Sequence, residues 1–240
     1  MRVPILLAII FLGLQTAFWY QTYLILPKME IVPNVPGEET VEAISLGDKE
    51  FFFRYLGLQL QNAGDTYGRF TALYKYDFNK LYHWFRLLDK LNPTSNYIPS
   101  MATYYFAQTQ NKPDVRYVVD YLAEHASARP EEKWWWLVQA AYLANHKLEN
   151  KELALRIAQP LADTQGIPLW ARQTPAFLYE QKGEFDAALD IIDNILADTD
   201  DIKQGELNFM RYFVEERLDR LEKVKHHRER LEKRPVPLEE

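Results

Sequence analysis

Apolar residues form one long block at the start of the chain, from Val3 to Leu26. Its roughly two dozen residues match the length of a helix that crosses a bilayer with some tilt. Trp19, Tyr20 and Tyr23 lie near its end, as is typical of an aromatic cluster at the membrane interface. The pattern therefore predicts a single transmembrane signal-anchor helix over residues 1–26.

A cleaved signal peptide, with Val3–Leu14 as its apolar region, is the main alternative to an anchor, and a buried helix is another. Bulky aromatic residues follow Leu14 and no clean small-x-small cleavage site is present, which favours the uncleaved anchor. Arg2 precedes the block, whereas mostly acidic residues follow it: Glu30, Glu38, Glu39 and Glu42. The positive-inside rule then predicts a single-pass membrane protein with a cytoplasmic N-terminus. The remaining chain would lie on the outer side, which is periplasmic if the protein is bacterial.

The next segment, residues 27–47, is rich in proline and acidic residues. This composition favours a short extended linker that holds the following domain away from the membrane.

From Asp48 onward the apolar residues recur at helical spacing, and breaks occur at regular intervals. Pro93, Pro130 and Pro168 are 37 and 38 residues apart. Asp77 and Asp114 each precede an apolar stripe and are predicted to cap a helix. The pattern predicts paired amphipathic helices over residues 48–222, because such pairs bury their apolar faces only by stacking on neighbours.

The clearest unit is Tyr179–Leu196, in which a glycine separates two helical patterns. Gly183, Phe185, Ala188 and Ile192 have the identities and spacing of a tetratricopeptide repeat, and the chain resembles that family over roughly 51–221. The resemblance implies an all-α, right-handed α-solenoid of helical hairpins whose first helices line a concave, protein-binding groove. Other helical-pair repeats share the same periodicity.

Beyond this unit, further apolar residues at helical spacing predict a long terminal helix that closes the stack: Leu207, Met210, Val214, Leu218 and Leu221. Residues 223–240 are predicted to form its polar end and a tail, as an exposed end of a helical stack requires.

Three consecutive tryptophans, Trp134-Trp135-Trp136, cannot all enter one core, because neighbouring helical residues point in directions about 100° apart. One predicted buried stripe contains Trp136, Leu137, Ala140, Leu143 and Ala144. Another face combines aromatic and hydrogen-bonding groups and is predicted to bind a partner: Trp135, Gln139, Tyr142 and His146, extended by Tyr105 and Gln108. The alternatives for Trp135 are packing against the adjacent hairpin and contact with the membrane interface.

Composition limits the other classes of function. A net charge of −6 argues against nucleic acid, and the lack of cysteine excludes a disulfide framework and thiolate metal sites. The scattered histidines His83, His125 and His146, with the adjacent pair His226-His227, are predicted to be solvated and not to bind metal. No catalytic or cofactor-binding motif occurs, so we expect no enzyme activity, no cofactor and no small-molecule substrate.

The sequence thus predicts a non-catalytic scaffold, anchored in a membrane, that binds protein partners in an envelope or membrane assembly. The alternative is a permanent structural accessory subunit of a larger membrane complex.

Overall fold

The structure is a computed structural model that describes residues 2–23, 30–66, 68–197, 216 and 223. Within these residues the predicted all-α class is confirmed, apart from one short antiparallel pair, β1 (Asp65–Thr66) with β2 (Arg69–Phe70). The predicted terminal helix and polar tail lie outside the described residues, except for Glu216 and Lys223.

The first helix, α1 (Arg2–Thr22), is not buried against any other described part of the chain. Two of its polar side chains are paired within the helix, since the Thr16 and Thr22 hydroxyls donate to the Leu12 and Phe18 carbonyls at 2.8 Å. Such internal pairing is what a hydrocarbon environment requires. The helix is therefore long and apolar enough to cross a membrane, a property that a signal sequence shares.

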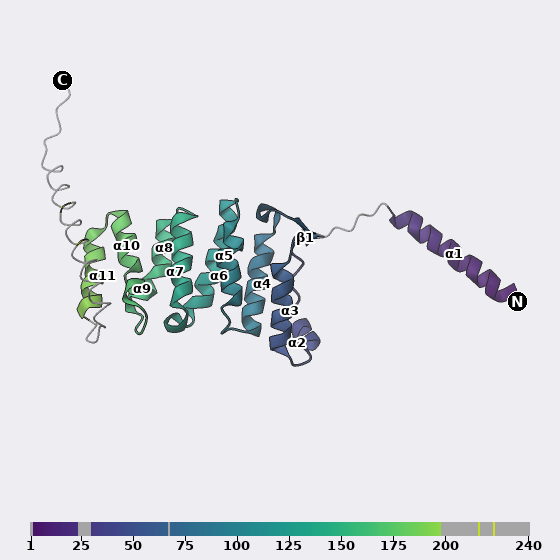
Figure 1. Cartoon of the computed structure of the whole chain (residues 1–240), viewed down its shortest axis with the longest axis horizontal. Coiled ribbons are helices and arrows are strands. Elements are labelled where there is room, and N and C mark those ends of the chain that lie inside the picture. The colour runs from purple at the N-terminus through teal and green to yellow at the C-terminus, as the bar shows by residue number, and fades with distance from the viewer. Residues whose placement is uncertain (1, 24–29, 67, 198–215, 217–222, 224–240) are drawn as a thin grey trace, which may run out of the picture.

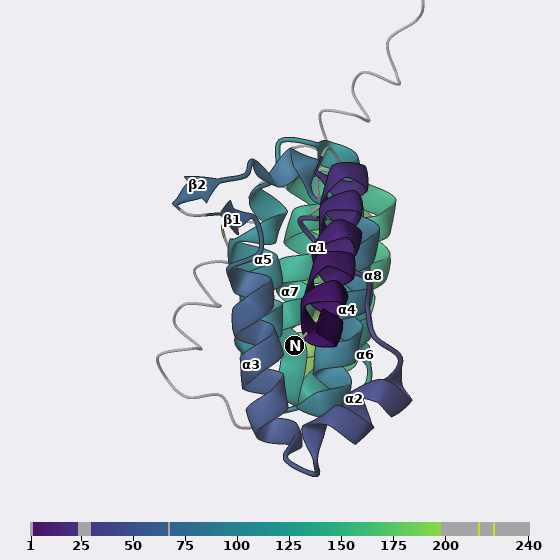
Figure 2. The same ribbon diagram turned by 90° about the vertical axis from the view of Figure 1, so that its right-hand side faces the viewer.

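The remaining helices stand side by side in a row (Figure 1). Looking along the row, α3, α5 and α7 lie toward one side and α4, α6 and α8 toward the other (Figure 2). Helices pack on their sequence neighbours, and α4 also packs on α6 and α8 on α10. The elements are α2 (Glu38–Ser45), α3 (Lys49–Gln61), η1 (Leu73–Lys75), α4 (Phe78–Leu91), α5 (Tyr97–Tyr104), η2 (Phe106–Gln108), η3 (Lys112–Asp114), α6 (Val115–Ser127), α7 (Pro130–His146), α8 (Lys151–Asp163), α9 (Leu169–Arg172), α10 (Thr174–Lys182) and α11 (Phe185–Ala197).

Helix ends lie at all three predicted positions, although one of them lacks the expected capping bond. Asp77 caps α4 by accepting a hydrogen bond from the Lys80 amide at 3.0 Å. Gly183 ends α10 with φ +81°, in the left-handed region that glycine adopts without a Cβ clash. Asp114 occupies the predicted N-cap position of α6, but its carboxylate accepts no capping bond, since a 3₁₀ turn ending at Asp114 leads into the helix.

The prediction of an extended linker at residues 27–47 is wrong over residues 30–47, which fold onto the domain. This segment contains α2, and Val32 and Val41 are among the buried core residues. The Pro33 carbonyl accepts a hydrogen bond from Trp84 Nε1 at 2.9 Å, and Glu30 pairs with Lys80 at 2.6 Å. Two apolar side chains and these polar partners hold the segment against α4.

The predicted stripe on α7 is confirmed, since Trp136, Leu137, Ala140, Leu143 and Ala144 are all buried. The main core runs from Val32 to Leu178 as one continuous cluster, and a smaller cluster covers the contact of α11 with α8 and α10. Ala188 and Ile192 are buried in that smaller cluster, as the hairpin pattern predicts.

Candidate partner-binding surface

A mostly apolar groove of about 280 Å³ lies between α7 and α10. α7 forms one wall and α10 the other, and the tryptophan of the short α9 adds to the lining. The groove is lined by Val138, Ala141, Tyr142, Asn145, His146, Trp170, Thr174, Phe177, Leu178 and Gln181. Its volume lies just below the range usual for small-molecule pockets, so it suits a large apolar side chain of a partner better than a free ligand.

Two of the predicted binding residues, Tyr142 and His146, form one side of this groove. They lie one helical turn apart on α7, so their side chains share a face. Their ring centroids are 4.5 Å apart, and Tyr142 is 55% exposed. An exposed aromatic pair of this kind supplies large contact area at low conformational cost.

A polar bridge joins α10 to α7 and α8 beside the groove. Asn145 Nδ2 donates to Gln181 Oε1 at 2.9 Å, and Lys151 Nζ donates to the Gln181 carbonyl at 2.9 Å. Because the Asn145 amide is held by Gln181 and contacts His146 Nε2 at 3.3 Å, the bridge fixes the spacing of the walls.

Beside the groove, Trp134, Trp135 and Trp170 form an edge-to-face cluster, with centroid separations of 5.3 to 6.1 Å. Trp135 is 37% exposed, and its Nε1 donates to the Tyr104 hydroxyl at 3.1 Å. The structure therefore places Trp135 mainly in packing between helices, one of the alternatives considered for it, with a remaining exposed edge.

The other predicted residues are dispersed. Gln139 is half-buried on α7 and does not line the groove, while Gln108 accepts a long 3.5 Å hydrogen bond from Lys147. Tyr105 is exposed and lies against Phe106. Of the six predicted residues, the structure brings only Tyr142 and His146 into the groove.

Sequence reasoning missed the opposite wall of the groove. Trp170 and Phe177 carry much of its apolar surface, and Gln181 carries its polar bridge. The available signal was Trp170 two residues after Pro168, at the start of the next helical pattern and 34 to 36 residues after the tryptophan run.

A second cluster that sequence reasoning missed is a buried polar network between α4, α6 and α7. The Tyr121 hydroxyl donates to Asp89 Oδ1 at 2.8 Å, and His125 Nδ1 contacts Asp89 Oδ2. Lys133 Nζ donates to the Pro93 carbonyl at 2.6 Å and lies 3.4 Å from His125 Nδ1. The prediction of a solvated His125 is thus wrong, because its ring is sealed between three helices.

Burial shifts the pKa values of two members of this network, Tyr121 and Lys133. It raises the pKa of the Tyr121 hydroxyl well above its usual value, and the Asp89 carboxylate acts in the same direction. Burial lowers the pKa of Lys133, and Asp89 partly offsets that effect. These side-chain contacts join α4, α6 and α7.

No cluster of three or more metal-ligating side chains occurs among the described residues. Comparison with protein-family models, with curated proteins and with solved structures finds no match to this chain.

Proposed function

We propose that this chain is a non-catalytic scaffold, anchored in a membrane by α1, that binds a segment of a partner protein in the groove between α7 and α10. In this proposal the row of helices is a tetratricopeptide-like α-solenoid. Its support is the succession of hairpins, the contacts of α4 with α6 and of α8 with α10, and the glycine turn at Gly183.

The groove is the observation that carries the proposal. It combines exposed aromatic rings on one wall, apolar side chains on the other and fixed polar groups between them. Binding energy in protein interfaces concentrates in such aromatic anchors, surrounded by groups that exclude water. The expected occupant is a helical or extended segment that inserts a large apolar side chain beside Tyr142.

The anchor defines where this groove operates. With Arg2 before α1 and acidic residues after it, the N-terminus is proposed to be cytoplasmic and the row of helices to lie on the outer side. Restriction to a layer next to the membrane raises the effective concentration of the groove for partners in the same membrane.

The test compares partner recovery from membranes by the full chain and by a Tyr142→Ala/Phe177→Ala double variant, which removes one anchor from each wall. Arg156→Ala, an exposed change on α8, is the matched control. We expect the double variant to lose at least tenfold in recovery of a specific partner, since losing two anchors costs on the order of 2 kcal/mol or more. Equal recovery by all three proteins would remove the groove from the proposal.

A further inference from the structure

The end of the row that faces the anchor carries a line of exposed apolar side chains. Phe51, Tyr55 and Leu58 lie at i, i+4 and i+7 on the outer surface of α3, so they share one face. Phe51 is 66% and Leu58 52% exposed. Leu46 at the α2–α3 turn, Ile44 in α2 and Phe70 in β2 are also exposed. Both α2 and β2 lie at the same end of the row as α3 (Figure 2). We call Leu46, Phe51, Tyr55 and Leu58 the α3 face.

The α3 face is apolar, whereas the exposed end of a helical stack is normally polar. The terminal helix of such a stack normally presents a polar outer surface, because no neighbour covers it. Here α3 is outermost, yet its outward stripe is aromatic and aliphatic. Contiguous exposed apolar surface of this kind marks a contact site.

Leu46, in the α2–α3 turn, has an unfavourable backbone conformation for a leucine. It adopts φ +49° and ψ +29°, the left-handed region that L-residues other than Gly, Asn and Asp rarely occupy, and it is 91% exposed. Neither the backbone, which favours glycine there, nor the core explains a leucine at this position.

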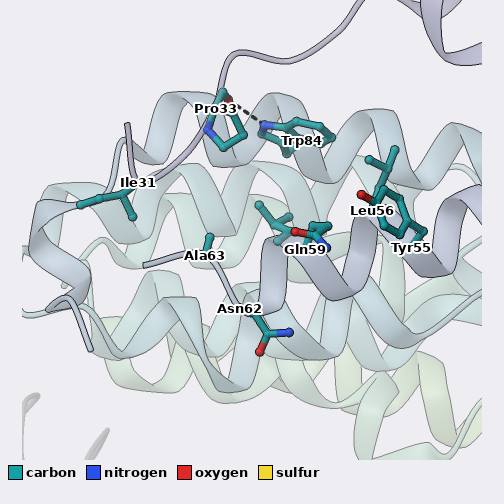
Figure 3. A pocket seen from close by; sticks show the side chains of 9 residues that line it. Ile31, Pro33, Tyr55, Leu56, Gln59, Asn62, Ala63 and Trp84 are labelled. Carbon is teal, nitrogen blue, oxygen red and sulfur yellow. Dashed lines mark hydrogen bonds between the residues drawn. The ribbon is translucent and has the colours of Figure 1, made fainter. Parts of the chain in front are cut away.

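Residues 24–29, which we call the tether, join α1 to the row of helices and keep the α3 face close to the membrane. Tyr23 follows α1, and the described domain begins again at Glu30, so the chain between them spans at most about 25 Å. Ile31 and Pro33, just after the tether, line a cavity of about 360 Å³ together with Tyr55 and Leu56 of α3 (Figure 3). The chain thus leaves the membrane and arrives directly beside the α3 face.

The charges around the face are paired with one another. Lys49 contacts Glu42 at 3.0 Å, and Arg54 contacts Glu50 at 2.7 Å. Both basic side chains of α3 are therefore paired with carboxylates, and the apolar side chains dominate the contact.

We infer that the α3 face lies on the bilayer surface, with Leu46 and Phe51 inserted among the lipid headgroups. The inference depends on α1 remaining as the proposed anchor. Its basis is the short tether, the projecting turn at Leu46 and a tyrosine and a phenylalanine on one stripe, all suited to a shallow interfacial insertion. The row of helices then extends away from the membrane, and the α7–α10 groove stands clear of the lipid.

The chain contains no cysteine, so single labelling sites are available without background. In the full chain, Leu46→Cys and Leu58→Cys would carry an environment-sensitive fluorophore, with Arg156→Cys on α8 as the control. Each labelled protein is reconstituted into phosphatidylcholine vesicles with or without brominated acyl chains. We expect severalfold stronger bromine quenching at positions 46 and 58 than at 156, with little dependence on salt, because the charges are paired.

Quenching at positions 46 and 58 no greater than at 156 would overturn the inference. A second copy of the chain covering the α3 face would also overturn it, and would show as shielding of the labels at 46 and 58 that disappears when the protein is diluted in the bilayer. Flotation of the vesicles under alkaline extraction distinguishes a wrong docking of the α3 face from failure of α1 as an anchor. If the chain does not float, α1 is not an anchor and the docking falls with it. If it floats without quenching at the α3 face, the anchor stands and only the docking is wrong.

Discussion

At the scale of single residues, the Asp89 side chain joins three members of the buried polar network between α4, α6 and α7. Asp89 accepts a hydrogen bond from the Tyr121 hydroxyl and contacts His125. It also partly offsets the lowering of the Lys133 pKa by burial. Asp89→Asn should destabilise the domain by about 2–3 kcal/mol, because it leaves the Lys133 charge without its nearby carboxylate.

Chemical denaturation measures this effect, and Asp120→Asn is the matched control. Asp120 makes an exposed pair with Arg116 on the same helix as His125, and such pairs contribute only about 0–0.5 kcal/mol. Equal losses in the two variants would mean that the buried network contributes no more than a surface pair.

Tyr76 gives the fold a defined response to alkaline pH. Its hydroxyl donates to the Ala63 carbonyl, and burial raises its pKa to about 12, with a further contribution from Tyr105. Because the folded-state pKa lies above the unfolded value of about 10, its contribution to stability is complete below pH 10 and is lost as the pH rises toward 12.

Denaturant unfolding at a series of pH values tests this response. Tyr76→Phe should lower stability near neutral pH through the lost hydrogen bond, yet flatten the decline between about pH 10 and 12. An unchanged alkaline slope in this variant would assign the decline to other groups.

At the scale of elements, close approach of α3 and α5 depends on Gly57. A Cβ at this position would lie 2.7 Å from Cε1 of Tyr97, which is too close for a ring held between helices. Gly57→Ala gains about 1 kcal/mol of helix propensity but overpacks the contact at a cost of about 1–3 kcal/mol.

We therefore expect net destabilisation from Gly57→Ala, measured as a lower melting temperature. Leu58→Ala, the next residue on the outer side of α3, should change stability far less because Leu58 is half exposed. A Gly57→Ala variant as stable as the wild type would show that Tyr97 moves aside freely.

The elements also show how far the sequence predicts the structure. Amphipathic stripes such as Trp136 to Ala144 are local, so helical spacing was sufficient to predict which side is buried. Gly183 was predictable for the same reason, since a left-handed turn selects glycine within a few residues.

Contacts between distant segments were not predictable. Residues 30–47 were interpreted as a linker because proline and acidic residues dominate them, but Val32 and Val41 find a core formed by helices further along the chain. Glu30 and Lys80 are 50 residues apart, so nothing local indicates their pairing. His125 was interpreted as solvated because its partners Asp89 and Lys133 come from two other helices.

At the scale of the whole molecule, the proposals give the row of helices two working ends. One end, at α3, is proposed to rest on the bilayer beside the tether. The groove between α7 and α10 lies further along the row (Figure 1). A rigid row between them holds the groove at a fixed height above the membrane, which selects partners whose binding segment reaches that height.

Photo-crosslinking in native membranes tests the central claim, the groove as a protein-binding site on an anchored scaffold, most directly. A photoreactive phenylalanine analogue would replace Tyr142 in the full chain, and the same analogue at Arg156 would serve as control. We predict one discrete protein adduct from position 142 that is lost when Phe177→Ala is added, and none from position 156. No adduct from position 142, or the same adducts from both positions, would contradict the account.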